Sequence, residues 1–211
     1  MDYSKSSSFQ TWGNNLPSCG ELDFFFWFKF DLWFVTFLHT ISFFTIKLVY
    51  RSACIGRFLF FFRLRRSEED YVLVRSDGTG CSSFLGKKGG SQTLNIQTGV
   101  CSNSFLHEIL HAVGMFHEEN RPDRDSYVKI HWENIQKGKE LQHMKMVPLY
   151  NYVLQFPYDE KSIMHPPYNI SSINGGPTIT SKRGLANEFI GGNSNRLTSI
   201  DILKIKSPFN C

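Results

Sequence analysis

The chain has 211 residues and a mass of 24.4 kDa, enough for one domain with its own hydrophobic core. Hydrophobic residues make up 41% and charged residues 20% of the sequence, a balance that excludes a wholly disordered chain. The net charge is only +4, and the Lys and Arg residues are scattered, so we expect no nucleic-acid partner.

Phenylalanine divides the chain into two parts, because most of its 20 Phe residues lie between Phe24 and Phe62. The polar residues 1–23 do not read as a cleavable signal peptide. The longest uncharged run, residues 32–46, is shorter than the roughly 20 residues that a membrane span needs. Three interpretations stay open: a membrane anchor, a folded Phe-rich element, or sequence that is not native protein. We therefore separate an atypical N-terminal segment, residues 1–49, from a globular domain, residues 50–211.

The globular part shows short elements separated by turn signals. The run Tyr71-Val-Leu-Val predicts a buried strand, and glycine-containing turns follow at residues 76–80 and 86–90. Residues 93–97 alternate as a half-exposed strand, which we expect to offer an edge to an extended peptide. Residues 102–117 predict a helix with one apolar stripe, and residues 198–205 predict a short closing helix.

The first of these helices carries the residues with chemistry. His107 and His111 are four residues apart, so both imidazoles project from one helix face and reach one zinc ion. Gly114 accepts a positive φ, which ends the helix and brings His117 towards the same ion from another direction. Three histidines and a water molecule indicate a catalytic zinc site rather than a structural one. Glu108, the next residue round the helix, is placed to hold that water.

The run from His107 to Ile130, HEILHAVGMFHEENRPDRDSYVKI, resembles the signature of the metzincin peptidases. Glu118 and residues 121–125 make it similar to the astacin family in particular. Residues 158–165, YDEKSIMH, resemble the family's Met-turn, whose methionine, here Met164, forms an apolar floor beneath the metal. The resemblance implies an α+β astacin-like catalytic domain with two subdomains flanking a zinc cleft, following the Phe-rich segment.

Five cysteines allow several pairings, and their spacing alone does not choose between them. The resemblance implies the disulfides Cys81–Cys101 and Cys54–Cys211, with Cys19 left over. Structural disulfides indicate an oxidising compartment, so we expect a secreted protein although no signal is visible. Asn169-Ile-Ser171 is a weak glycosylation sequon that fits this location.

The sequence departs from the family after the Met-turn. Where the family has a tyrosine that binds zinc and stabilises the oxyanion, this chain has Pro166, and Tyr168 two residues later is a candidate substitute. In the family, the glutamate that corresponds to Glu118 is linked to the freed N-terminus of the mature enzyme.

These features favour a secreted zinc endopeptidase that holds one Zn²⁺ per chain, acts on protein or peptide substrates and is a monomer. Glu108 is its expected general base, and His107, His111 and His117 are its metal ligands. Two alternatives stay open: a zinc-binding pseudoprotease that serves as an interaction domain, motivated by Pro166, and a membrane-anchored form of the enzyme.

Overall fold

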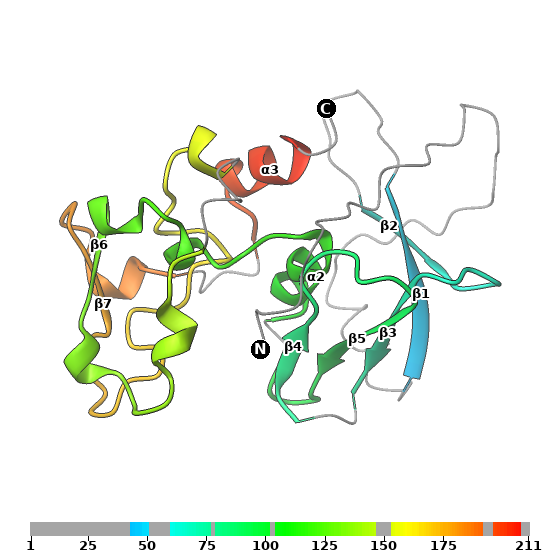
Figure 1. Cartoon of the computed structure of the whole chain (residues 1–211), viewed down its shortest axis with the longest axis horizontal. Helices are drawn as coiled ribbons and strands as arrows, with labels where there is room; N and C mark the ends of the chain where they lie inside the picture. The colour runs from blue at the N-terminus through cyan, green and yellow to red at the C-terminus, as the bar shows by residue number, and fades with distance from the viewer. Residues whose placement is uncertain are drawn as a thin grey trace. The chain divides into compact units, whose positions relative to one another are not determined.

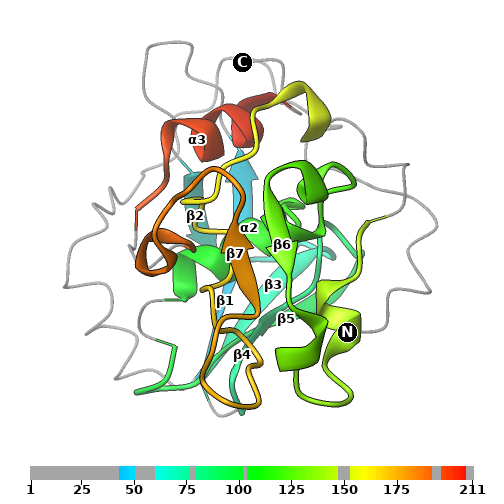
Figure 2. The same ribbon diagram turned by 90° about the vertical axis from the view of Figure 1, so that its left-hand side faces the viewer.

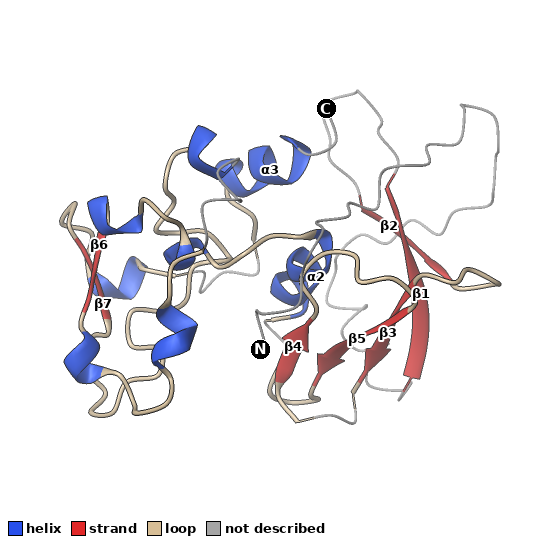
Figure 3. Cartoon of the chain, in the orientation of Figure 1, coloured by secondary structure: helices blue, strands red, loops and turns tan. Residues whose placement is uncertain are grey.

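The computed structural model describes residues 43–50, 60–76, 79–101, 104–146, 153–191 and 196–207. For residues 43–50 and 60–64 it describes the backbone alone. The described residues belong to two compact units that divide between Met115 and Phe116, and each unit is described by itself below. Figure 1 shows the chain coloured from one end to the other, and Figure 3 shows its helices and strands.

The first unit is built on a mixed five-stranded sheet in the order β2-β1-β3-β5-β4. Its strands are β1 (Phe43–Tyr50), β2 (Phe60–Leu64), β3 (Tyr71–Arg75), β4 (Cys81–Ser83) and β5 (Ser91–Ile96). Only the β3–β5 pair is parallel; the other pairs are antiparallel. Two Phe-containing stretches of the N-terminal region are therefore strands of this sheet.

One face of the sheet is buried through alternate residues of its central strands. Val72 and Val74 of β3 and Leu94 of β5 are at most 4% exposed, while their neighbours along each strand are half-buried. The polar Gln92 is also buried, and it is satisfied because its amide bonds to the backbone of Gly86 and Lys88. The predicted strands at residues 71–74 and 93–97 are thus both present.

The prediction that residues 93–97 form an edge strand is wrong. β5 pairs with β3 on one side and with β4 on the other, so its backbone hydrogen-bonding groups face two neighbours. Alternation of polar and apolar residues indicates that one face of a strand is exposed to solvent. It does not indicate whether the strand lies at the edge of the sheet. In the described sheet, β4 is the edge strand on this side.

Helix α2 (Phe105–Val113) packs against β4 and β5. It is shorter than the predicted span of 102–117, because Gly114 at its C-terminus has φ of 114° and turns the chain out of the helical path. The backbone N–H of Gly114 caps the carbonyl groups of Leu110 and His111. The prediction that Gly114 ends the helix with a positive φ is therefore confirmed.

A disulfide between Cys81 and Cys101 joins β4 to the segment that follows β5. It closes a separation of 20 residues, and loop closure of that size stabilises the fold by about 3 kcal/mol. The pairing implied by the resemblance is present here. The other implied pair, Cys54 and Cys211, lies outside the described residues.

The second unit contains little regular structure. Strands β6 (Val128–Ile130) and β7 (Ile179–Ser181) form an antiparallel pair, which Figure 2 shows from the side of this unit. Short 3-10 helices cover residues Glu118–Asn120, Arg124–Ser126, Trp132–Asn134, Glu140–His143 and Asn187–Phe189. One hydrophobic cluster of this unit consists of Val128, Ile130, Ile135, Tyr158 and Ile179.

Helix α3 (Ser199–Lys206) closes the described chain and matches the helix predicted at 198–205. Its N-cap is Thr198, whose hydroxyl accepts a hydrogen bond from the Asp201 N–H while the Asp201 carboxylate accepts one from the Thr198 N–H. Such a capping box satisfies two backbone donors that a helix otherwise leaves open. None of the helices among the described residues has the length and apolar character needed to cross a bilayer.

Candidate metal centre

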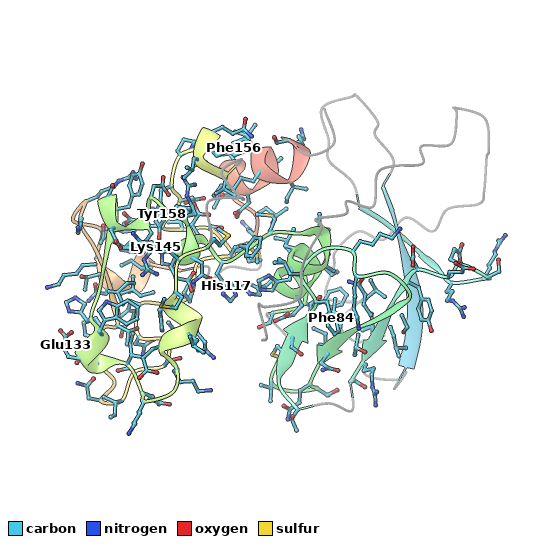
Figure 4. All side chains as sticks on the ribbon, in the orientation of Figure 1. Phe84, His117, Glu133, Lys145, Phe156 and Tyr158 are labelled. Atoms are coloured by element: carbon cyan, nitrogen blue, oxygen red, sulfur yellow. A yellow bond between two sulfur atoms is a disulfide. The ribbon has the colours of Figure 1, made fainter. Side chains whose placement is uncertain are left out.

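Three histidines of one continuous segment lie close together, two of them on α2 and the third in the segment that follows it. One ligand nitrogen from each of His107, His111 and His117 lies within 4.8 Å of the others. Nitrogens bound to a tetrahedral zinc ion at about 2.0–2.1 Å lie roughly 3.4 Å apart, so small side-chain movements complete the group. The rings of His107 and His111 meet edge to face, with their centroids 4.6 Å apart, and the two residues are one helical turn apart. His117, which follows the helix in sequence, is labelled in Figure 4.

A hydrogen bond to the backbone fixes the tautomer of His111. Its Nδ1 lies 2.8 Å from the carbonyl oxygen of Met115, which requires a proton on Nδ1 and an unprotonated Nε2. Burial, followed by the proximity of His107, lowers the pKa of His111 to about 3. The imidazole is therefore in the neutral form that binds metals.

Glu108 brings a carboxylate to the same part of the helix. Its side chain is buried at 5% exposure, and its Oε2 has no hydrogen-bond partner among the described residues. Burial raises the pKa of Glu108 to about 7, and a cation bound nearby would lower it again. A buried carboxylate oxygen without a hydrogen-bond donor, on the helix that carries two of the imidazoles, fits a hydrated zinc ion, because water on the ion would supply the missing donor.

Glu118, directly after the third histidine, is buried in a set of polar contacts. Its Oε1 accepts hydrogen bonds from the Asp159 N–H at 3.0 Å and from Arg121 Nη1 at 3.1 Å. Its Oε2 accepts one from the Lys204 ammonium at 2.5 Å. The resemblance links this glutamate to the N-terminus of a mature enzyme; among the described residues, a lysine of α3 contacts it.

The segment that resembles the Met-turn is fixed by hydrogen bonds on both sides. Met164 is fully buried, and its carbonyl accepts a hydrogen bond from the Glu118 N–H at 3.0 Å. The Ser162 hydroxyl accepts from the Met164 N–H at 3.0 Å and donates to Asp201 at 2.5 Å. Within the second unit, the turn thus contacts both the residue after His117 and helix α3.

His165, beside Met164, has both ring nitrogens engaged elsewhere. Its Nδ1 lies 2.8 Å from the carbonyl oxygen of Pro166, so it carries the proton, and its Nε2 accepts from the Tyr158 hydroxyl at 3.1 Å. Burial lowers the pKa of His165 to about 4. This histidine is neutral and packs in the interior of the second unit, which the sequence did not indicate.

Comparison with known protein families assigns the chain to a family. The family model for the astacin peptidases matches residues 42–210.

The chain belongs to the astacin family.

Individual relatives agree with this assignment. The chain is 37% identical over 144 residues to zinc metalloproteinase nas-4 of Caenorhabditis elegans, covering 67% of this chain and 44% of that protein. It is 40% identical over 149 residues to high choriolytic enzyme 1 of Oryzias latipes, covering 70% of this chain and 53% of that protein. The chain therefore spans about half the length of these relatives, or less.

A solved structure shares the fold. The hatching-enzyme zinc protease HCE-1 of medaka superposes with a TM-score of 0.62 at 38% identity, covering 71% of this chain and 73% of that chain. The expected α+β astacin-like fold is thereby confirmed. The family match begins at residue 42 and β1 at Phe43, both ahead of residue 50, where we expected the domain to start.

Zinc is the metal of this astacin domain. The three-histidine group, the neutral His111 and the open oxygen of Glu108 all fit that ion.

The departure from the family at Pro166 lies in a rigid stretch of this astacin domain. The carbonyl oxygen of Tyr168 accepts hydrogen bonds from the backbone N–H groups of Thr178 and Ile179 and from the Thr178 hydroxyl. The backbone at Tyr168 is therefore fixed, and its side chain is half-buried. Asn169, the predicted glycosylation site, is exposed, as attachment of a glycan requires.

Gly191 packs directly on the two prolines of this stretch. Its φ is +88°, and a Cβ atom placed on it would lie 2.6 Å from the Pro166 carbonyl oxygen and 2.8 Å from the Pro167 Cα. Both contacts are with backbone, which cannot rotate away. Only glycine fits here.

We expect Gly191→Ala to lower the free energy of unfolding by about 2–4 kcal/mol, the sum of left-handed backbone strain and overpacking. Urea denaturation measures the change. Gly138 is a matched control because its φ is +87° and nothing lies within 4 Å of the point that a Cβ atom would occupy. Gly138→Ala should cost only the strain, about 1–2 kcal/mol. Equal losses in the two variants would show that the contact with Pro166 is not rigid.

Proposed function

We propose that this chain is a zinc-dependent endopeptidase that hydrolyses internal peptide bonds of proteins. The observation that carries the proposal is the group of His107, His111 and His117, together with the buried Glu108 of α2, whose Oε2 has no hydrogen-bond partner among the described residues. Membership of a metallopeptidase family supports it. Medaka HCE-1 is described as a hatching-enzyme zinc protease, which favours protein substrates for this chain too.

The roles of the residues follow from their chemistry. The three imidazoles would hold the zinc ion, and the apolar side chain of Met164 would lie beneath it. When bound, zinc supplies a Lewis acid and lowers the pKa of a coordinated water to about 7. Glu108 would accept a proton from the attacking water and later deliver it to the leaving amine.

An extended substrate would pair with the edge strand β4 rather than with β5. Among the described strands, β4 has β5 on one side only, and so its other side would offer backbone donors and acceptors to a peptide. Phe84 follows this strand and is 43% exposed, which would give an apolar side chain of the substrate a partner. Both features belong to the first unit, which also carries Glu108 and two of the histidines.

An assay on an internally quenched peptide tests the proposal. Zinc-loaded protein should cleave it, mass spectrometry of the products should locate the cut at an internal bond, and a zinc chelator should abolish the reaction. Binding of zinc without cleavage of any peptide in a diverse library would favour the alternative, a zinc-binding interaction domain. We further propose that the protein is secreted and monomeric, and the Cys81–Cys101 disulfide supports an oxidising compartment.

The presence of Pro166 favours the alternative of an inactive, zinc-binding pseudoprotease. A proline offers neither a side-chain donor nor a backbone N–H to an oxyanion. Loss of one such donor costs about 10²–10³ in rate. We therefore expect Pro166→Tyr to raise kcat by about 10²-fold without changing zinc content, as measured in the same peptide assay.

Tyr168→Phe is the companion variant, since it removes only a hydroxyl. If Tyr168→Phe leaves kcat unchanged and Pro166→Tyr raises it, the unaltered chain lacks a donor that stabilises the oxyanion. A large loss from Tyr168→Phe and no gain from Pro166→Tyr would instead assign the role to Tyr168.

A further inference from the structure

Glu118 is the centre of a buried ionic group in the second unit. Its side chain is 4% exposed, and its partners Arg121 and Lys204 are 1% and 3% exposed. Lys204 comes from helix α3, 86 residues further along the chain, and its ammonium lies 2.5 Å from Glu118 Oε2. Buried ion pairs of this kind are strongly perturbed when one partner is removed, because the other charge is left uncompensated.

The two cations of the group are not equivalent. Arg121 donates from Nε to Asp123 at 2.9 Å and from Nη2 to the other Asp123 oxygen at 2.8 Å, in addition to its bond with Glu118. Its guanidinium is therefore shared between two carboxylates. Lys204 supplies the second positive charge, and within the described part of the chain Glu118 is the carboxylate with which it forms an ion pair. Replacing Lys204 would leave the group one positive charge short.

Helix α3 fixes the same region through a second residue. Asp201, one turn before Lys204, accepts hydrogen bonds from the Ser162 hydroxyl and from the Ile163 N–H. The contacts then run from Ser162 to Met164, from the Met164 carbonyl to the Glu118 N–H, and from Glu118 to Lys204. Together with the turn of α3 between Asp201 and Lys204, these contacts form a closed ring. Glu118, which follows His117 in the sequence, takes part in it through both its backbone N–H and its carboxylate.

We infer that Lys204 is a positioning residue of the metal centre: through Glu118 it fixes the backbone at His117 and thereby the third zinc ligand. The inference rests on the proposed zinc centre. Lys204 does not contact the substrate or the metal in this role; it acts through the carboxylate that it neutralises. Partners of this kind typically change metal affinity by about 10–100-fold when they are removed.

The direction of the effect separates positioning from simple electrostatics. Removing a positive charge near a cation site would, through the loss of Coulomb repulsion alone, strengthen the binding of the cation. Displacement of His117 would weaken it. A weaker zinc affinity in a variant that lacks the Lys204 charge therefore identifies positioning.

The experiment compares Lys204→Met with Lys206→Met, which removes the same charge from a half-buried position of the same helix. Zinc Kd is measured by competition with a chromogenic chelator, and Tm is measured with and without zinc. The Co²⁺-substituted proteins supply a ligand-field spectrum that reports the coordination geometry. We expect Lys204→Met to raise the zinc Kd by about 10–100-fold and to alter the Co²⁺ spectrum, and Lys206→Met to change neither. Lys204→Arg, which keeps the charge and the donors, should restore most of the affinity.

The increase of Tm on zinc binding distinguishes positioning from a merely structural role. A structural role would lower the Tm of the zinc-free and zinc-loaded forms equally, whereas positioning reduces the increment that zinc adds. Equal lowering with an unchanged zinc Kd overturns the inference. If Lys204→Met does not fold, Lys204→Gln, which keeps a hydrogen-bond donor, undergoes the same measurements with the same criteria. Failure of the unaltered protein to bind zinc would instead refute the proposed metal centre itself.

Discussion

Glu108→Gln should lower kcat for peptide hydrolysis by about 10²–10⁴-fold, the usual contribution of a general base, while zinc content stays near one ion per chain. Glutamine keeps the size and hydrogen-bonding shape of the side chain but cannot accept a proton. Glu108 is buried and its Oε2 has no protein partner among the described residues, so the change leaves no other ion pair broken there. Steady-state kinetics and metal analysis on the same preparation provide the two readouts.

Glu133→Gln is a suitable control for this variant, because Glu133 is an exposed carboxylate that contacts His131, well away in sequence from the zinc ligands. It should retain full activity. A Glu108→Gln protein that turns over at the normal rate would remove Glu108 from the mechanism, whatever its zinc content.

Replacing any one of the three histidines by alanine should abolish both zinc retention and activity. His107→Ala, His111→Ala and His117→Ala each take away one of three imidazoles, and the two ligands that remain do not hold zinc tightly. Metal analysis after dialysis against a weak chelator measures the loss. We expect zinc content to fall from near one ion per chain to close to none in each variant.

His165→Asn serves as the control for the ligands. His165 is the nearest histidine in sequence to Met164, yet its two nitrogens bond to Pro166 and Tyr158, so its replacement should lower stability and leave the zinc stoichiometry unchanged. Full zinc retention by any of the three alanine variants would contradict the ligand assignment.

The grouping of the three histidines could be predicted from sequence because its geometry is local. His107 and His111 are related by helical periodicity, and Gly114 has the positive φ that brings His117 back towards them. The strands at residues 71–75 and 91–96 and the helix at 199–206 were also indicated by short-range patterns. Each of these features is determined within a few residues.

Tertiary partners could not be predicted in this way. The pairing of β5 with both β3 and β4 depends on the order of strands in the sheet, which the alternation within one strand does not encode. Lys204 and Asp201 have the sequence pattern of ordinary polar residues on an amphipathic helix, and only the fold places them against Glu118 and Ser162. The burial of His165 against Tyr158 is of the same kind.

The long separation between Glu118 and Lys204 has a consequence for how the protein folds. The pair is 86 residues apart, so closing that loop costs entropy that no local element repays, and contacts of this length form late. In a chain emerging from the ribosome, His107, His111 and His117 are synthesised before α3. Glu118 cannot form its ion pair with Lys204 until α3 has been synthesised. The ligand segment is thus synthesised well before the helix that completes its surroundings, and a nascent chain should acquire its final zinc affinity only after α3 has been made and contacts Glu118.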